Sequence, residues 1–317
     1  FLLILYTDSR RSDVPGIFLS EKTGFRLSFS AVPLNFTHSA FRQFLKKGGA
    51  VMSAADTEKK ISRTYVIPGK GKRIGEGAPG ILVSATGRTP EAILEAVKRL
   101  AADPAVDGIE LRLDHLDSGR NSDQILEITG LVNQAYAAAP DKILIATVRT
   151  GKEGGEASYT AAEYLRLLGS LIRYSRMDLI DLEVSRGEEL LAPLVEAAHA
   201  AGIGVIMSSH NFSETPDSEK LRETLELERK LGGDILKLAV MPRKASDVAR
   251  LLLVTAEARE AGLGPLVTMA MGPLGSISRV SGGIFGSALT FAMSGTASAP
   301  GQMAVEDVKR SLGLFSV

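Results

Sequence analysis

The sequence predicts an α/β protein, a (β/α)8 barrel of the TIM type with an N-terminal β-hairpin that closes the bottom. Eight short runs alternate with segments of helical period, and these runs are almost continuously apolar, as strands covered on both faces should be. A doubly wound open sheet is the alternative, but it usually has a Gly-x-Gly-x-x-Gly loop after its first strand, and none follows here. The runs are 81–85, 108–113, 143–148, 179–184, 203–207, 235–240, 266–271 and 285–291.

The segments before and between the runs contain turn and helix-start signals. Residues 63–67 precede the glycine-rich stretch 69–77, which suggests a small hairpin ahead of the barrel. Thr89 is placed to cap the helix after the first run. Thr160 and Glu163 have the spacing of a capping box after the third run. These signals support the alternation of strands and helices.

Composition and charge exclude several classes of function. Thirty-seven basic residues balance 37 acidic ones, which argues against a nucleic-acid partner. Without cysteine, the chain has no disulfide, thiolate nucleophile or cysteine-based zinc site, and the reducing cytoplasm is the simplest location. No apolar run reaches the roughly 18 residues that a membrane-spanning helix requires. We therefore expect a cytoplasmic protein with a small-molecule partner and no membrane or nucleic-acid partner.

The first 51 residues differ in texture from the rest and hold seven of the eleven phenylalanines. Met52 follows the stretch 46–49, Lys-Lys-Gly-Gly, whose codons can resemble a ribosome-binding site. Our hypothesis is that residues 1–51 are translated upstream sequence, and a genuine N-terminal extension is the alternative. Residues 52–317 are expected to form one barrel domain.

Lys237 and His210 are the first candidates for chemistry, because barrel enzymes react at the C-terminal ends of their strands. Lys237 lies inside the sixth run, between apolar residues. If it points into the barrel, partial desolvation favours the neutral amine, which can attack a carbonyl carbon. His210 ends the fifth run and suits proton transfer near neutral pH. A structural lysine at a strand end and an ordinary loop histidine remain the alternatives.

Charged residues end the neighbouring runs. Glu110 and Arg112 are two residues apart and share one face of a strand, where they either bind a ligand or pair with each other. Arg149 ends the third run, and the glycines after it allow a loop that brings Glu153 back over the barrel mouth. Asp181, with Glu183 on the same strand face, is placed to orient the ring of a nearby histidine.

The C-terminal segment adds three polar candidates. Arg279 is suited to clamp a carboxylate in bidentate fashion. Ser298 and Gln302 flank a Pro-Gly turn and are suited to bind hydroxyl groups, although such a turn is often only a turn.

In order and spacing these segments resemble type I 3-dehydroquinate dehydratase, the shikimate-pathway lyase. The similarity runs from about Val66 to Phe315 and is most specific in the histidine-to-lysine spacing and the last motif. The leader to Val51 and the Ser-Ser-His-Asn context of the histidine depart from the family pattern. The matching motifs are Glu110-Leu-Arg112, Arg149-Thr-Gly-Lys-Glu153-Gly-Gly-Glu156, Ile180-Asp181-Leu-Glu183, Met207-Ser-Ser-His210-Asn-Phe, Lys237-Leu-Ala-Val-Met-Pro, Ile277-Ser-Arg279 and Ser298-Ala-Pro-Gly-Gln302.

The resemblance implies a role for each matching residue. Lys237 matches the lysine that forms an imine with the C3 ketone of 3-dehydroquinate, and His210 matches the general base and acid. Glu153 matches the carboxylate paired with that histidine, Asp181 a second acidic neighbour, and Arg279 the clamp on the substrate carboxylate. The residues that match groups holding the hydroxyls and ring are Ser84, Glu110, Arg112, Arg149, Ser298 and Gln302.

The resemblance also implies the reaction. Water is lost with syn stereochemistry across C1–C2 to give 3-dehydroshikimate, the third step toward chorismate and the aromatic amino acids. The imine acts as the electron sink, so no metal or external cofactor is implied, and a homodimer is expected because the family is commonly dimeric.

Two alternatives remain open. A class I aldolase or transaldolase would bind sugar phosphates through glycine-rich backbone amides, whereas Arg279 suits a carboxylate. A non-catalytic barrel that only binds a shikimate-like acid predicts loss of Lys237 or His210, and both are present.

Overall fold

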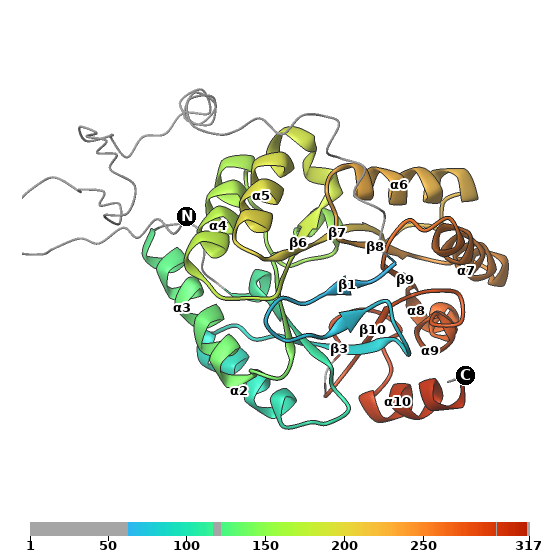
Figure 1. The fold of residues 1–317 in the computed structure, drawn as a ribbon, viewed down its shortest axis with the longest axis horizontal. Helices are drawn as coiled ribbons and strands as arrows, with labels where there is room; N and C mark the ends of the chain where they lie inside the picture. Colours follow the sequence, from blue (N-terminus) through green and yellow to red (C-terminus); the bar gives the residue numbers. More distant parts are fainter. Residues whose placement is uncertain (1–62, 117–121, 296, 316–317) are drawn as a thin grey trace, which may run out of the picture. The chain divides into compact units, whose positions relative to one another are not determined.

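The computed structural model describes residues 63–116, 122–295 and 297–315. In this part of the chain, parallel strands form a central barrel that helices surround (Figure 1). The expected leader 1–51 and the expected start at Met52 lie outside the described residues.

The central sheet contains eight parallel strands in the order β10-β3-β4-β5-β6-β7-β8-β9, which confirms the predicted barrel. The first and last strands of this order, β10 and β9, come together and close the barrel. Leu266 forms a parallel bridge with Ser287, and the Ala288 amide donates to the Leu266 carbonyl at 2.7 Å. The strands are β3 Gly80–Ala85, β4 Gly108–Arg112, β5 Ile143–Thr147, β6 Leu179–Glu183, β7 Gly204–Asn211, β8 Ile235–Val240, β9 Leu266–Ala270 and β10 Leu289–Ala292.

Two predicted strand bounds were wrong in an informative way. The last strand begins at Leu289 rather than near residue 285, because the amides of Phe285 and Ser287 both donate to the Gly282 carbonyl in a turn. The fifth strand of the barrel, β7, continues to Asn211, so His210 lies within the strand and is held by its ladder.

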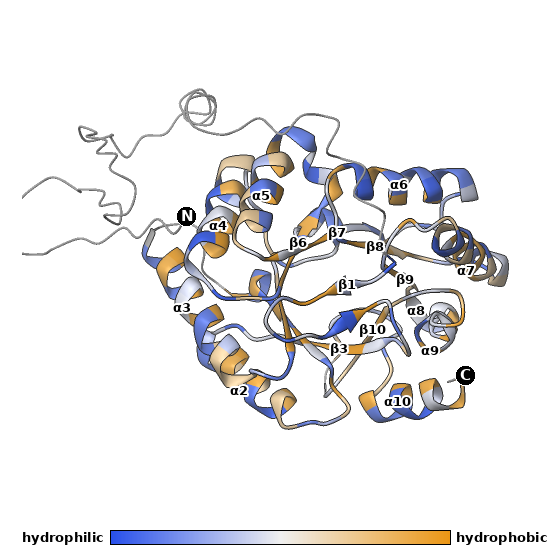
Figure 2. Cartoon of the chain, viewed as in Figure 1, coloured by the Kyte–Doolittle hydropathy of each residue, from blue (hydrophilic) through white to orange (hydrophobic). Residues whose placement is uncertain are grey.

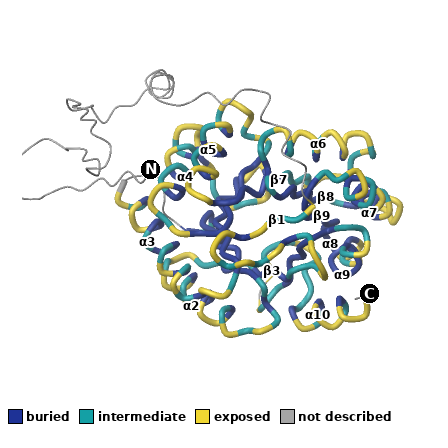
Figure 3. Tube along the Cα trace, in the orientation of Figure 1, coloured by how far each residue is buried: buried dark blue, intermediate teal, exposed yellow. Residues whose placement is uncertain are grey.

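The helices pack their apolar faces on the outside of the barrel. The predicted caps are present, since Thr89 accepts from the Ala92 amide at 3.3 Å and Thr160 forms a full capping box with Glu163. The strands are buried, whereas the outer turns of the helices are exposed and, in α6, strongly hydrophilic (Figures 2 and 3). The helices and short 3-10 turns are α2 Pro90–Ala101, η2 Leu113–His115, α3 Ser122–Ala138, η3 Gly151–Glu153, α4 Ala161–Tyr174, η4 Val184–Arg186, α5 Glu188–Ala200, α6 Ser218–Lys230, α7 Ala245–Glu260, α8 Gly272–Gly275, α9 Ile277–Ser281 and α10 Val305–Leu314.

The predicted hairpin consists of β1 Tyr65–Val66 and β2 Arg73–Ile74, which pair antiparallel. Ile67 and Ile74 are buried in the core cluster that fills the barrel interior. The Tyr65 hydroxyl lies so close to Gly204, at the start of β7, that a Cβ there would come within 2.4 Å of it. The hairpin therefore covers the N-terminal ends of the strands, and the C-terminal ends are left for a site.

Among the described helices, none combines the length and the apolar character that crossing a membrane would require.

Candidate active site

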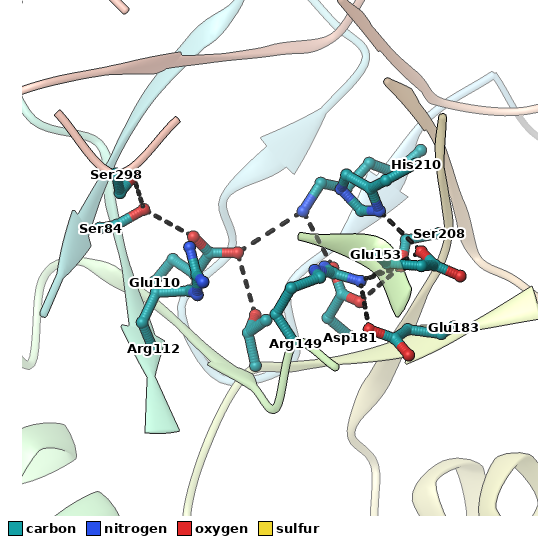
Figure 4. A network of polar contacts seen from close by, with 12 residues as sticks. Ser84, Glu110, Arg112, Arg149, Glu153, Asp181, Glu183, Ser208, His210 and Ser298 are labelled. Atoms are coloured by element: carbon teal, nitrogen blue, oxygen red, sulfur yellow. Dashed lines mark hydrogen bonds and ion pairs between the residues drawn. The ribbon is translucent and has the colours of Figure 1, made fainter. Parts of the chain in front are cut away.

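A cavity lies at the C-terminal ends of the barrel strands, and the residues predicted from the sequence gather there. All of them line it except Asp181, which lies just beneath and contacts two of the lining side chains. Figure 4 shows how several of them, among them Glu110, Arg149, Glu153 and His210, converge from different strands and the loops that follow the strands. The predicted residues that line the cavity are Ser84, Glu110, Arg112, Arg149, Glu153, His210, Lys237, Arg279, Ser298 and Gln302.

Lys237 points from β8 into the barrel, and its side chain is only 5% exposed. Its Nζ donates to Asp181 Oδ2 at 3.0 Å and to Glu110 Oε1 at 3.5 Å. The face of the Phe291 ring lies 4.7 Å from Nζ and covers it on an apolar side. Lys237 is thus a lumen residue held between two carboxylates and an aromatic ring, and not a lysine that reaches solvent from a strand end.

His210 and Glu153 form a hydrogen-bonded pair beside this lysine. The His210 ring nitrogen Nδ1 lies 2.8 Å from Glu153 Oε2. Glu153 ends the short helix η3, and the loop turns back sharply because Gly155 packs directly on the Arg149 carbonyl, where a Cβ would be only 2.0 Å away. The glycine-rich loop therefore brings Glu153 over the mouth, as predicted.

The two members of this pair have opposite pKa shifts. Burial, with the positive charges of Arg149 and Lys237, holds the pKa of His210 well below its usual value. Burial raises the pKa of Glu153 to about 7, although Arg149 opposes the rise. Above neutral pH the pair therefore holds a neutral imidazole whose Nδ1–H donates to an ionised Glu153. In that state Nε2 carries the lone pair that can accept a proton.

Arg149 organises the carboxylates below the pair. Its guanidinium donates to Asp181 Oδ2 at 2.7 Å, to Glu183 Oε1 at 3.2 Å and to Ser208 Oγ at 3.0 Å. Ser208 in turn donates to Asp181 Oδ1 at 2.6 Å. Burial opposes ionisation, but Arg149 and Lys237 together hold the pKa of Asp181 well below its usual value. Asp181 is therefore a permanent anion next to Lys237, and not a proton donor.

Glu110 and Arg112 have separate partners, so the alternative of a self-satisfied pair was wrong. Glu110 accepts from Ser84 Oγ at 2.6 Å and from Thr147 Oγ1 at 3.0 Å. Arg112 donates to both oxygens of Asp114, at 2.9 and 2.8 Å. Asp114 balances the charge of Arg112, and Lys237 lies 3.5 Å from Glu110 as its nearest cation.

Arg279 is a buried cation whose partners are neutral. Its Nη1 and Nη2 donate to the carbonyls of Phe291 and Pro300 at 3.3 and 3.0 Å, and its Nε has no hydrogen-bond partner among the described residues. Burial lowers its pKa to about 10, with no carboxylate to offset the effect. An anion entering the cavity would supply the missing charge.

Ser298 and Gln302 flank the Pro300 carbonyl that Arg279 contacts, and they form one end of a hydroxyl chain along the cavity wall. Gln302 Oε1 accepts from the Ser298 amide at 2.7 Å, and its Nε2 donates to Ser298 Oγ at 3.1 Å. Ser298 Oγ donates to Ser84 Oγ at 3.0 Å, and Ser84 continues to Glu110 (Figure 4). This wall offers hydroxyl, amide and carboxylate groups that can donate to and accept from the hydroxyls of a polyhydroxylated ring.

Sequence reasoning missed several residues that support the site. Thr147 and Ser208 stand two positions before Arg149 and His210, so the strand period of two was a signal that they face the lumen. Ser185, which donates to Glu153 Oε1, follows β6 in a turn and had no such signal. Within 63–116, 122–295 and 297–315, no group of three or more His, Asp or Glu side chains is arranged as a metal site.

Fold and site together define an enzyme of the barrel class, with a buried lysine, a histidine–carboxylate pair and an anion-binding arginine in one cavity. Residues 81–317 match the family model for type I 3-dehydroquinase, and the chain belongs to that family.

Similar proteins agree with this family. The 3-dehydroquinate dehydratase of Salmonella paratyphi B is 39% identical over 244 residues, which cover 76% of this chain and 95% of that protein. The crystal structure of 3-dehydroquinate dehydratase from Geobacillus kaustophilus is 32% identical with a TM-score of 0.75, covering 80% of this chain and 97% of that one. The type I enzyme from Clostridium difficile, with covalently modified comenic acid, is 34% identical with a TM-score of 0.75, covering 80% and 98%.

Proposed function

We propose that this protein converts 3-dehydroquinate to 3-dehydroshikimate by loss of water, through an imine between Lys237 and the substrate ketone. The observation that carries the proposal is the position of Lys237 Nζ, buried in the lumen against Asp181 in a cavity that His210 and Arg279 also line. The family and the similar proteins are named for the dehydration of 3-dehydroquinate, which supports the choice of this substrate.

Imine formation begins with attack of Lys237 Nζ on the C3 carbonyl. The carbinolamine then loses water, and His210 supplies and removes the protons that these steps require. The product is an iminium cation in a buried site, where an isolated charge is costly. Asp181 lies 3.0 Å from Nζ and stays ionised, so it balances that cation.

Proton abstraction follows at C2, next to the iminium. His210 Nε2 accepts the C2 proton, while Glu153 stabilises the imidazolium through Nδ1. The electron pair moves toward the iminium nitrogen, and its return expels the C1 hydroxyl, which leaves as water with the proton from His210. Donation from the same ring on the same face accounts for syn elimination. Water then hydrolyses the product imine and frees Lys237.

The cavity walls hold the rest of the substrate. Arg279, a buried cation without a carboxylate partner, binds the C1 carboxylate. Ser84, Glu110, Ser298 and Gln302 bind the ring hydroxyls. Arg112 and Arg149 face the cavity, but most Arg149 donors are taken by Asp181, Glu183 and Ser208, so its main role is to hold those carboxylates.

Turnover measurements test this proposal. The native protein is mixed with 3-dehydroquinate, and the conjugated enone of the product is followed by ultraviolet absorbance. We expect conversion by the native protein, none by Lys237→Ala with substrate binding retained, and little by His210→Ala. A panel of sugar phosphates tests the aldolase alternative. Cleavage of a sugar phosphate without dehydration of 3-dehydroquinate would reject the proposal.

We also propose that the protein is a cytoplasmic homodimer. Large apolar side chains are exposed on helices that contact one another, at Leu274 on α8, Ile277 on α9 and Leu314 on α10, and such a face suits a second copy. The balanced net charge supports the expectation of no nucleic-acid partner. Sedimentation of the native protein and Ile277→Lys tests the dimer, because a native monomer would contradict it.

A further inference from the structure

Glu153 has a second hydrogen-bond partner that the family reaction does not by itself require. Its Oε2 faces His210 Nδ1, and its Oε1 accepts from the Ser185 hydroxyl. Ser185 belongs to η4, the turn after β6, whereas Glu153 belongs to η3, the turn after β5. Glu153 is buried and lines the cavity, whereas Ser185 is an exposed residue. The serine hydroxyl is thus a donor that reaches the buried carboxylate from a separate, solvent-exposed turn.

Charged groups of both signs act on the ionisation of Glu153. Arg149 Nη1, at the end of β5, is 3.6 Å from Oε2 and favours the ionised form. Glu183 and Asp181 on β6 oppose ionisation, and so does burial, which has the largest effect. Burial lowers the pKa of His210 on β7, and burial raises the pKa of Glu228 on α6. Besides His210 Nδ1–H on Oε2, the Ser185 hydroxyl on Oε1 is a second neutral donor that favours the carboxylate.

We propose that Ser185 is a positioning residue for the acid–base pair, which fixes the Glu153 carboxylate toward His210 and favours its ionised form. This inference rests on the proposed function, since it concerns the same pair. An ionised Glu153 accepts from Nδ1 and keeps the proton-accepting lone pair on Nε2, toward the substrate. A protonated Glu153 would withdraw that support from the imidazolium. Ser185 therefore extends the pH range of activity toward acid.

The η4 turn does not depend on Ser185 for its shape, which makes the residue testable. The guanidinium of Arg186 stacks on the Tyr164 ring at 4.2 Å and donates to the Tyr159 carbonyl at 3.2 Å. The Gly187 amide closes the turn on the Val184 carbonyl at 3.1 Å. Replacing Ser185 by alanine removes one hydroxyl and leaves these anchors in place.

The first test is the pH dependence of kcat and kcat/KM for the native protein, Ser185→Ala and Ser185→Thr. The control is Ser175→Ala, a serine at the end of α4 whose hydroxyl bonds only the Thr129 carbonyl among the described residues. Because a hydroxyl donor favours the carboxylate, its loss raises the pKa of Glu153. We expect the acid limb of the pH–activity profile of Ser185→Ala to move to higher pH by about 0.5–1 pH unit. We also expect kcat to fall by a larger factor than KM changes. Ser185→Thr should restore the native limb, and Ser175→Ala should not move it.

An unmoved acid limb in Ser185→Ala would overturn the inference, because solvent water would then replace the hydroxyl completely. A shift that Ser185→Thr fails to restore would also overturn it. The second test needs no turnover: the His210 ring nitrogens are titrated by 15N NMR in the free native protein and in Ser185→Ala. We expect the change in the ring-nitrogen shifts that accompanies ionisation of Glu153 to move to higher pH in the variant. If the native protein proved inactive on 3-dehydroquinate, the proposed function would fail, and this titration alone would decide the role of Ser185.

Discussion

Substituting Glu153 by glutamine should stabilise the protein at alkaline pH while it impairs catalysis. Glu153 is 4% exposed, and its pKa is raised from the ordinary 4.5 to about 7. A group with a raised pKa favours folding while it is protonated, so this contribution is present below pH 4.5 and is lost as pH rises through 7. Glutamine keeps an acceptor for His210 Nδ1 but cannot ionise.

The magnitude follows from the shift. Each pKa unit corresponds to about 1.4 kcal/mol, so ionising the buried Glu153 costs the folded state about 3 kcal/mol. Burial lowers the pKa of His210 in the native protein, and because glutamine keeps an acceptor for Nδ1 we expect the contribution of His210 largely to cancel in the comparison. The difference in free energy of unfolding, Glu153→Gln minus native, should therefore rise between pH 4.5 and 7 and level off above.

Urea denaturation at a series of pH values measures this difference directly, with kcat measured on the same samples. We expect the variant to gain stability relative to the native protein as pH rises, and to lose at least about tenfold in kcat because the imidazolium lacks its counter-charge. A stability difference that stays constant with pH would refute the assignment of a raised pKa to Glu153.

Three further substitutions probe the rest of the barrel. Glu228→Met should raise the free energy of unfolding by about 1–3 kcal/mol, and more at pH 8 than at pH 5, because the carboxyl group is buried and burial raises its pKa well above the usual value. A difference from the native protein in urea denaturation that is the same at both pH values would contradict this. Arg279→Lys should raise KM about 10–100-fold, since a point charge replaces a bidentate clamp, and an unchanged KM would argue against carboxylate binding there. Gly155→Ala should lower kcat, because its Cβ would lie 2.0 Å from the Arg149 carbonyl, whereas the control Gly151→Ala, whose nearest contact is at 3.8 Å, should not.

The sequence predicted the barrel because its strands are covered on both faces and are therefore continuously apolar. The same pattern could not locate the start of β10, since Phe285 and Ala288 continue the apolar run although the chain at 285–287 still turns back on the Gly282 carbonyl. Strand alternation placed Glu110 and Arg112 on one shared face, and the position of Lys237 inside an apolar strand suggested that it points into the barrel; all three line the cavity.

Partners across the barrel could not be predicted in this way. Nothing local indicates that Glu110 bonds Ser84 on β3 and Thr147 on β5, because these contacts depend on the stagger of neighbouring strands. The contact of Ser185 with Glu153 joins two separate loops, and its discovery required the folded chain.

The central claim concerns the bond between Lys237 and the substrate, and borohydride trapping tests it most directly. The protein is incubated with 3-dehydroquinate, the imine is reduced, and the digested protein is mapped by mass spectrometry. We predict one stable adduct, on the peptide that contains Lys237, and loss of activity in proportion to the adduct. Full turnover with an unmodified Lys237, or an adduct on a different lysine, would contradict the mechanism.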